Sequence, residues 1–326
     1  MKEISPETKL ILQTINSYGP VRPTDLTKVL NISNTTLHKH LSKLLDEQLV
    51  VKLGKSPRVY YSINSSPTIE ISSGDKDDKS IEESYIYVSP TGEIIRGLNG
   101  FKIWSERNGY DFLTKKKSYI QRLKEINKLK KSGYFSSKKT ILSGRRELYL
   151  DNVFFSEYYN FDDFGKTKLG QLVYVSKTSQ NKDLIREIAR NIKPDITKII
   201  KKFNIKIVCF IPPTIDRKIQ FLDVLKQALN LEQKEIKICK IPSPTKVAQK
   251  TLRKLDDRII NAQTTIAVNP VQIINKNVLI IDDATGSGAT MNETAKKIRK
   301  ISKDNIKIYG YSVVGSYKGY DVISEV

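Results

Sequence analysis

The sequence is poor in cysteine and has no long hydrophobic run. Its 326 residues include only two cysteines, Cys209 and Cys239, and both lie in apolar runs that predict buried strands. We therefore expect buried thiols in a reducing cytoplasm rather than a disulfide or a metal site. No apolar stretch approaches the ~20 residues needed to span a bilayer, and the N-terminus lacks the layout of a signal peptide. These absences predict a cytoplasmic protein without membrane spans.

Acidic residues are scarce relative to basic ones. The net charge is +21, with 56 Lys and Arg against 35 Asp and Glu. Residues 115–146 carry twelve Lys or Arg and one acid, Glu125. This clustering predicts a polyanionic partner, with nucleic acid favoured over a membrane surface. The alternative is that a lysine-rich composition makes the whole chain basic, which would not account for the clustering.

One stretch carries most of the recognisable chemistry, residues 278–290, which read VLIIDDATGSGAT. Four apolar residues predict a buried strand, Asp282 and Asp283 follow directly, and small or hydroxylated residues come next. Helical spacing begins at Met291. A glycine-rich turn between a strand and a helix lets backbone N–H groups approach a phosphate at the positive end of the helix. No Gly-Lys-Ser/Thr sequence ends the turn, so it is not a Walker loop. The order predicts a sugar-phosphate site at the carboxyl edge of a sheet.

This stretch resembles the phosphoribosyl diphosphate (PRPP) signature of type I phosphoribosyltransferases. By that resemblance, Asp282 and Asp283 would be the catalytic acids that hold the ribose 2′- and 3′-hydroxyls. Gly286 departs from the signature, because many members carry Thr or Ser there, and one hydroxyl contact is therefore missing. The resemblance also implies Mg²⁺ bound together with PRPP, without a metal site of the protein's own. The residues that would surround the 5′-phosphate are Ala284, Thr285, Gly286, Ser287, Gly288, Ala289 and Thr290.

Strand and helix patterns alternate through the second half of the chain. This alternation predicts an α/β fold with a parallel, Rossmann-like sheet. We assign residues 151–326 to a phosphoribosyltransferase-like domain. The predicted strands are residues 153–155, 172–176, 205–211 and 235–241, and the predicted helices are residues 182–192 and 219–229.

Two further segments resemble the ComF-like branch of this family. The loop after the first core strand, residues 212–218, would hold the diphosphate of PRPP, with Arg217 and Lys218 as the contacts. Lys177, in the sequence VYVSKTSQNKDL, resembles the lysine of the family's Leu-Lys-Tyr segment and would add a third cation.

A last element of this resemblance lies in residues 249–261, which read QKTLRKLDDRIIN. They are similar to a Gln-x-x-Leu…Arg-x-x-Asn pattern of ComF-like proteins, and Arg258 would close over the diphosphate. The alternative for Arg258 is a surface salt bridge to Asp256 or Asp257, which would contribute little to stability.

The first 66 residues predict a separate domain. Three helical patterns are followed by two strand patterns around a basic turn, an order that resembles the winged helix-turn-helix of small bacterial and archaeal repressors. The helix after Ser33 would read base edges in the major groove, and the turn would touch phosphate or the minor groove. The alternative is a module that binds only proteins. The predicted DNA contacts are Asn34, Thr35, Thr36, His38 and Lys39 on the helix and Lys55 and Arg58 on the turn.

Two segments separate these domains. Residues 67–84 are rich in Ser, Asp, Lys and Gly and predict a flexible linker. Residues 85–150 form a basic middle segment of uncertain fold. This segment could serve oligomerisation or be a second nucleic-acid surface, since its lysines alternate with aromatic residues. A solvated basic face over a small core is an equally good interpretation.

We interpret the chain as a DNA-binding transcription regulator whose phosphoribosyltransferase-like domain binds PRPP or a nucleotide as an effector. Purine repressors of Gram-positive bacteria resemble this combination of domains. One alternative is an active transferase of nucleotide metabolism, which moves phosphoribose from PRPP to a nitrogenous base. Another is a component of nucleic-acid processing or defence. Both resemblances imply a homodimer.

Overall fold

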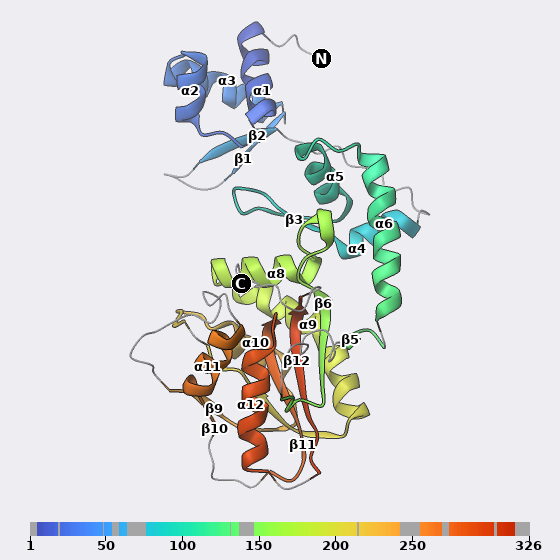
Figure 1. The fold of residues 1–326 in the computed structure, drawn as a ribbon. Helices are drawn as coiled ribbons and strands as arrows, with labels where there is room; N and C mark the ends of the chain where they lie inside the picture. The colour runs from blue at the N-terminus through green and yellow to red at the C-terminus, as the bar shows by residue number, and fades with distance from the viewer. Residues whose placement is uncertain are drawn as a thin grey trace. The chain divides into compact units, whose positions relative to one another are not determined.

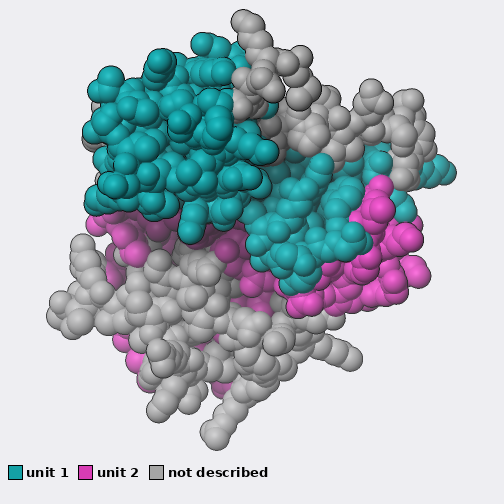
Figure 2. Space-filling view, turned by 90° about the horizontal axis from the view of Figure 1, so that it is seen from above, with its two compact units in different colours: residues 1–112 teal, residues 113–326 magenta. Residues whose placement is uncertain are grey.

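The computed structural model divides the chain into two compact units, Met1–Phe112 and Leu113–Val326 (Figures 1 and 2). In the part of the chain that the structure describes, no helix is long and apolar enough to cross a membrane. The described residues are 5–18, 20–47, 49–53, 59–63, 76–130, 132–136, 147–213, 215–241, 255–268, 274–302 and 305–316, with the backbone alone for 255–258.

The first unit begins with three helices and a two-stranded antiparallel sheet. The elements are α1 (Pro6–Tyr18), α2 (Pro23–Leu30), α3 (Asn34–Asp46), β1 (Val50–Leu53) and β2 (Tyr60–Ile63). Their buried side chains form one small core, because each helix turns one apolar stripe inward. The order of elements is the one that the sequence predicts. The core residues are Ile11, Ile15, Leu26, Leu37, Leu41, Leu44, Val50 and Tyr61.

The rest of the first unit corrects the predicted linker. Its second half forms a helix, α4 (Lys76–Ser84), which is followed by β3 (Ile86–Val88), β4 (Ile94–Arg96) and α5 (Gly97–Arg107). Ile81 of α4 is fully buried, and Glu82 Oε2 accepts a hydrogen bond of 2.9 Å from the backbone N–H of Leu98 at the start of α5. The polar composition of this segment does not predict a helix, because the helix is stabilised by packing on α5 and not by intrinsic helix propensity.

The second unit is built on a six-stranded sheet in the order β5-β6-β12-β11-β7-β8. Only β5 (Phe135–Ser136) is antiparallel to its neighbour. Strand β11 is central, pairs in parallel with both neighbours, and has four fully buried residues, 278–281. The α/β class with a mainly parallel sheet is therefore confirmed. The parallel strands are β6 (Asn152–Tyr158), β7 (Ile205–Phe210), β8 (Lys234–Glu235), β11 (Asn277–Thr285) and β12 (Ile308–Gly315).

Helices cover both faces of this sheet. Tyr311 of β12 forms a hydrogen bond of 2.6 Å with Ser156, whose hydroxyl donates to Asp195 of α9. A Cβ on the adjacent Gly310 would lie 2.8 Å from the sulfur of Met291 on α12. Successive strand residues point to opposite faces, so α9 and α12 lie on opposite sides. The unit's helices are α6 (Phe112–Leu129), α8 (Lys168–Ser179), α9 (Lys182–Lys202), α10 (Phe221–Leu229), α11 (Leu255–Thr265) and α12 (Ala289–Lys300), with a 3₁₀ turn η1 (Asp162–Phe164).

Three expectations for this unit were wrong. Residues 172–176 lie in α8 and are not a strand, and α9 continues through Pro194 to Lys202. The predicted strand 235–241 is divided between β8 and a separate antiparallel hairpin of β9 (Ile238–Lys240) and β10 (Ile266–Val268). This hairpin exposes Cys239, whereas Cys209 in β7 is buried as expected.

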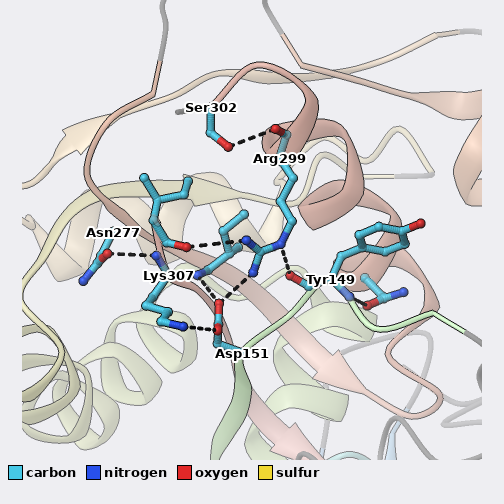
Figure 3. Close-up of polar contacts among 9 residues, drawn as sticks. Tyr149, Asp151, Asn277, Arg299, Ser302 and Lys307 are labelled. Atoms are coloured by element: carbon cyan, nitrogen blue, oxygen red, sulfur yellow. Dashed lines mark hydrogen bonds and ion pairs between the residues drawn. The ribbon is translucent and has the colours of Figure 1, made fainter. Parts of the chain in front are cut away.

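A polar network closes the amino-terminal edge of the sheet (Figure 3). Asp151, just before β6, accepts a hydrogen bond of 2.8 Å from Arg299 of α12 and forms an ion pair with Lys307 at 3.2 Å. Arg299 also donates to the carbonyl of Tyr149 at 2.8 Å, and Asn277 at the start of β11 accepts from the N–H of Lys307 at 2.9 Å. The network fixes one end of three strands and leaves the other end for the loops that follow them.

Candidate sugar-phosphate site

The central strand carries the two acids at its carboxyl end. Strand β11 extends to Thr285, so Asp282 and Asp283 are strand residues, and the predicted loop is shortened to residues 286–288. Gly288, at φ 66°, is the N-cap of α12, which begins at Ala289. A left-handed conformation is available to glycine without strain. The first turn of α12 has N–H groups without helical partners, which suits an anion.

Asp283 forms an ion pair with Lys177 of α8. The side chains are only 20% and 12% exposed, and the lysine ammonium also lies 5.6 Å from the ring centroid of Phe221. Lys177 was predicted as a diphosphate contact and Asp283 as a ribose contact. The fold brings these two residues together from positions more than a hundred residues apart in the sequence.

The loop after β7 is attached to the same end of α8. Arg217 donates a hydrogen bond of 2.9 Å to the main-chain carbonyl of Lys177, and the N–H of Ile219 donates to the side chain of Gln180 at 3.0 Å. Arg217 is half-buried, while Lys218 is exposed. The structure thus places two of the predicted diphosphate contacts, Lys177 and Arg217, in direct contact with each other.

Asp282 has an unusual electrostatic environment. Its burial, followed by the charge of Asp283, raises the pKa of its carboxyl group to about 7. A hydrogen bond of 2.8 Å from the N–H of Asp283 opposes this rise, as do the charges of Lys177 and Lys240. Near neutral pH, Asp282 can therefore either accept or donate a hydrogen bond.

Lys240, on β9, is a site residue that the sequence reasoning missed. It is half-buried; burial lowers the pKa of its ammonium group, and the charge of Asp282 opposes that effect. No motif marks this lysine, and its strand was predicted as part of the main sheet. Only the hairpin that carries it brings it within electrostatic range of the acids.

Several predicted residues have no described environment. The side chain of Arg258 lies outside the described residues, as do Gln249, Leu252, Lys55 and Arg58. Among the described residues, no group of three or more His, Cys, Asp and Glu side chains is placed to hold a metal ion.

In the first unit, the start of α3 presents its polar side chains to solvent. Asn34, Thr35, His38 and Lys39 are exposed. Thr36 is exposed too, and its hydroxyl and N–H both bond to the cap residue Ser33, at 2.8 and 3.1 Å. Their exposure leaves these side chains accessible to another molecule, although the hydroxyl of Thr36 is already bonded to Ser33.

His40 has a different environment from its neighbours on α3. Its ring nitrogen Nδ1 lies 2.8 Å from the hydroxyl of Thr8 on α1. This histidine therefore helps to pack the helices and does not lie with the predicted contacts.

One known protein family matches about half of this chain. The profile of the family PRTase-CE matches residues 160–326. A hypoxanthine phosphoribosyltransferase from Staphylococcus aureus is similar at 14% identity, over 40% of this chain and 63% of its own, with a TM-score of 0.22. An adenine phosphoribosyltransferase from Leishmania tarentolae is similar at 11% identity, over 48% of this chain and 91% of its own, with a TM-score of 0.25. This chain thus spans less than two thirds of the first of these structures, and no curated protein matches it.

Proposed function

Because the chain belongs to the PRTase-CE family of phosphoribosyltransferase domains, we propose that its second unit binds PRPP, or a nucleotide, at the carboxyl edge of β11. The observation that carries the proposal is the meeting of Asp283, Lys177 and Arg217 at the end of the strand that leads into the glycine-capped helix α12. Each comes from a different segment. Acids that suit sugar hydroxyls and cations that suit phosphates are thereby concentrated at one place.

The arrangement suggests how the ligand is held. The hydroxyls of the ribose bind Asp282 and Asp283, and the 5′-phosphate binds the backbone of residues 284–290 at the start of α12. The negative charge of the diphosphate is balanced by four cationic side chains, those of Lys177, Arg217, Lys218 and Arg258. Lys177 must then exchange its partner, from Asp283 to a phosphate oxygen. Mg²⁺ enters with PRPP and is held mainly by ligand oxygens and water.

The first unit binds DNA in this proposal. Its three helices and antiparallel strand pair suit the winged helix-turn-helix arrangement, and the exposed start of α3 suits a helix that reads base edges. The protein is then a regulator in which the ligand favours one arrangement of the units, and the shift in DNA affinity is no larger than the ligand's preference for that arrangement. A homodimer belongs to the same proposal.

An active transferase is the second candidate, and the intact acid pair favours it. A base nitrogen would attack C1′ of PRPP and lose its proton, while the C1′–O bond breaks and diphosphate leaves with the bonding electrons. Lys177 and Arg217 would stabilise the leaving group electrostatically. A regulator that only binds its ligand could lose one of the acids more readily than an enzyme could.

Calorimetric titration with PRPP and Mg²⁺ tests the shared premise. We expect saturable binding by the wild type and strongly weakened binding by Asp282→Asn and Asp283→Asn. If the wild type does not bind PRPP or nucleotides, the proposal is wrong. Release of diphosphate in the presence of a panel of bases would favour the enzyme. A change in DNA affinity on adding PRPP, without release, would favour the regulator.

A further inference from the structure

The two adjacent acids of β11 face opposite sides of the sheet. Ile280 pairs with Gly310 and Asp282 with Ser312 in parallel register. Because Gly310 faces α12 and strand residues alternate in direction, Asp282 lies on the α12 side. Asp283 lies on the other side, where it meets Lys177 of α8. Lys177 therefore cannot neutralise both carboxylates to the same extent.

The hairpin of β9 and β10 lies on the α12 side as well. Lys297 of α12 donates hydrogen bonds to the carbonyl of Ile266 in β10 and, at 2.7 Å, to that of Gln263 at the end of α11. Ile266 pairs in turn with Lys240 of β9. The helix that follows the phosphate loop thus holds the strand that carries Lys240.

We propose that Lys240 is a positioning residue for the ribose site: its ammonium group balances the carboxylate of Asp282 from the α12 side, as Lys177 balances that of Asp283 from the α8 side. This inference rests on the proposed function. Lys240 does not need to touch the ligand. Its role is to favour the ionised form of Asp282, so that a larger fraction of the carboxylate can accept a hydrogen bond from a ribose hydroxyl near neutral pH.

The other charges near Asp282 do not replace this lysine. The charges that act on Asp282 are, largest first, those of Asp283 on its own strand, Lys177 and Lys240. Lys177 is already paired with Asp283. On α12, Lys297 is bonded to two carbonyl oxygens, and the buried Glu293 is another acid, which would oppose ionisation.

The test is the pH dependence of PRPP binding with Mg²⁺, measured by calorimetry from pH 6 to pH 8.5. The variants are Lys240→Met, Lys240→Arg and, as a matched control, Lys237→Met at an exposed residue three positions earlier. In the wild type, affinity weakens as Asp282 becomes protonated. We expect Lys240→Met to move the midpoint up by about one pH unit, which lowers the affinity about fivefold at pH 7 and little at pH 8.5. Lys240→Arg and Lys237→Met should keep the wild-type midpoint, and the ligand's own protonation is the same for all variants.

The Asp282→Asn background tests whether Lys240 acts through Asp282. There, adding Lys240→Met should change the affinity less than about twofold. A wild-type midpoint in Lys240→Met, or an equal loss at every pH, overturns the inference even when the wild type binds PRPP. Failure of the wild type to bind would instead contradict the proposed function.

The pH dependence of stability, measured without ligand, provides a further test. Because Lys240→Met leaves Asp282 harder to ionise, the free energy of unfolding should fall more steeply between pH 5 and pH 8 than in the wild type. If Lys240→Met does not fold, Lys240→Gln serves the same comparison. Equal slopes in the wild type and the variant would also contradict the inference.

Discussion

Arg217 and Lys177 are joined by a hydrogen bond from the guanidinium group to a main-chain carbonyl, 2.9 Å long. Through this bond, the loop after β7 is fixed to the last turn of α8, whose lysine is paired with Asp283. The position of each cation therefore depends on the other. This dependence allows the half-buried Arg217 to be distinguished from the exposed Lys218.

We predict that Arg217→Ala raises the Kd for PRPP about 10- to 100-fold, because it removes a charged phosphate contact and releases the loop. Lys218→Ala should raise it less than about fivefold, as expected for an exposed charge. Calorimetry with PRPP and competition by inorganic diphosphate measure both. Equal effects of the two variants would show that the bond to Lys177 has no part in binding.

The ion pair of Lys177 and Asp283 should stabilise the second unit. Both side chains are largely shielded, so removing one partner leaves a charge poorly solvated. We expect Asp283→Asn or Lys177→Met alone to lower the free energy of unfolding by about 1–3 kcal/mol. The free energy of unfolding should fall less in the double variant than the sum of the decreases in the two single variants, and urea denaturation measures all three decreases. Strict additivity would mean that the pair does not form in solution.

The raised pKa of Asp282 makes a prediction about stability and pH. Folding raises this pKa from 3.8 to about 7, so between these values the folded state binds more protons than the unfolded one. Stability from this group is therefore present at low pH and is lost as pH rises through 7. Asp282→Asn should flatten this part of the profile and, at pH 8, stabilise the protein by on the order of 1–3 kcal/mol.

Urea denaturation at pH 5 and pH 8 measures this difference. Glu187→Gln, on α9, serves as a control in which the profile keeps its wild-type shape. If Asp282→Asn is less stable than the wild type at pH 8, the proposed environment of Asp282 is wrong.

The sequence predicted the centre of the second unit well because the signals there are local. A buried apolar run, two acids and small residues define β11, its edge and the start of α12 within a few positions of each other. Residues 172–176 were wrongly predicted to form a strand because a short apolar run fits a buried helix as well as a strand. In α8 this run is buried on more than one side, with Leu172, Val173 and Val175 all inside.

The parts of the site that could not be predicted depend on long-range contacts. Nothing near Lys240 in the sequence indicates that its strand leaves the main sheet and joins β10, twenty-six residues later. The ion pair of Lys177 and Asp283 likewise depends on how α8 lies over the sheet. Resemblance marked Lys177 and Asp283 separately, and the fold brings them into contact.

The DNA-binding proposal makes a separate prediction for α3. Lys39→Ala should reduce the slope of log affinity against log salt by about one, because one phosphate contact is lost. Lys9→Ala, at an exposed lysine of α1, is the matched control and should leave the slope unchanged. Thr35→Ala should change sequence preference when bound DNA is selected and sequenced. If the slope of log affinity against log salt is equal in all three variants and the wild type, α3 does not contact the DNA phosphates.

The network at the amino edge of the sheet should affect stability without affecting the ligand. Arg299 joins Asp151 and the carbonyl of Tyr149 on the side away from the acids (Figure 3). We expect Arg299→Ala to lower the free energy of unfolding by about 2–4 kcal/mol, because it leaves Asp151 and a carbonyl with fewer partners. Since the carboxyl edge is unchanged, the Kd for PRPP at 20 °C should stay within about twofold of the wild type. A large loss of affinity in a folded Arg299→Ala protein would mean that the two edges of the sheet are coupled, and the ligand contacts assigned to the carboxyl edge would have to be revised.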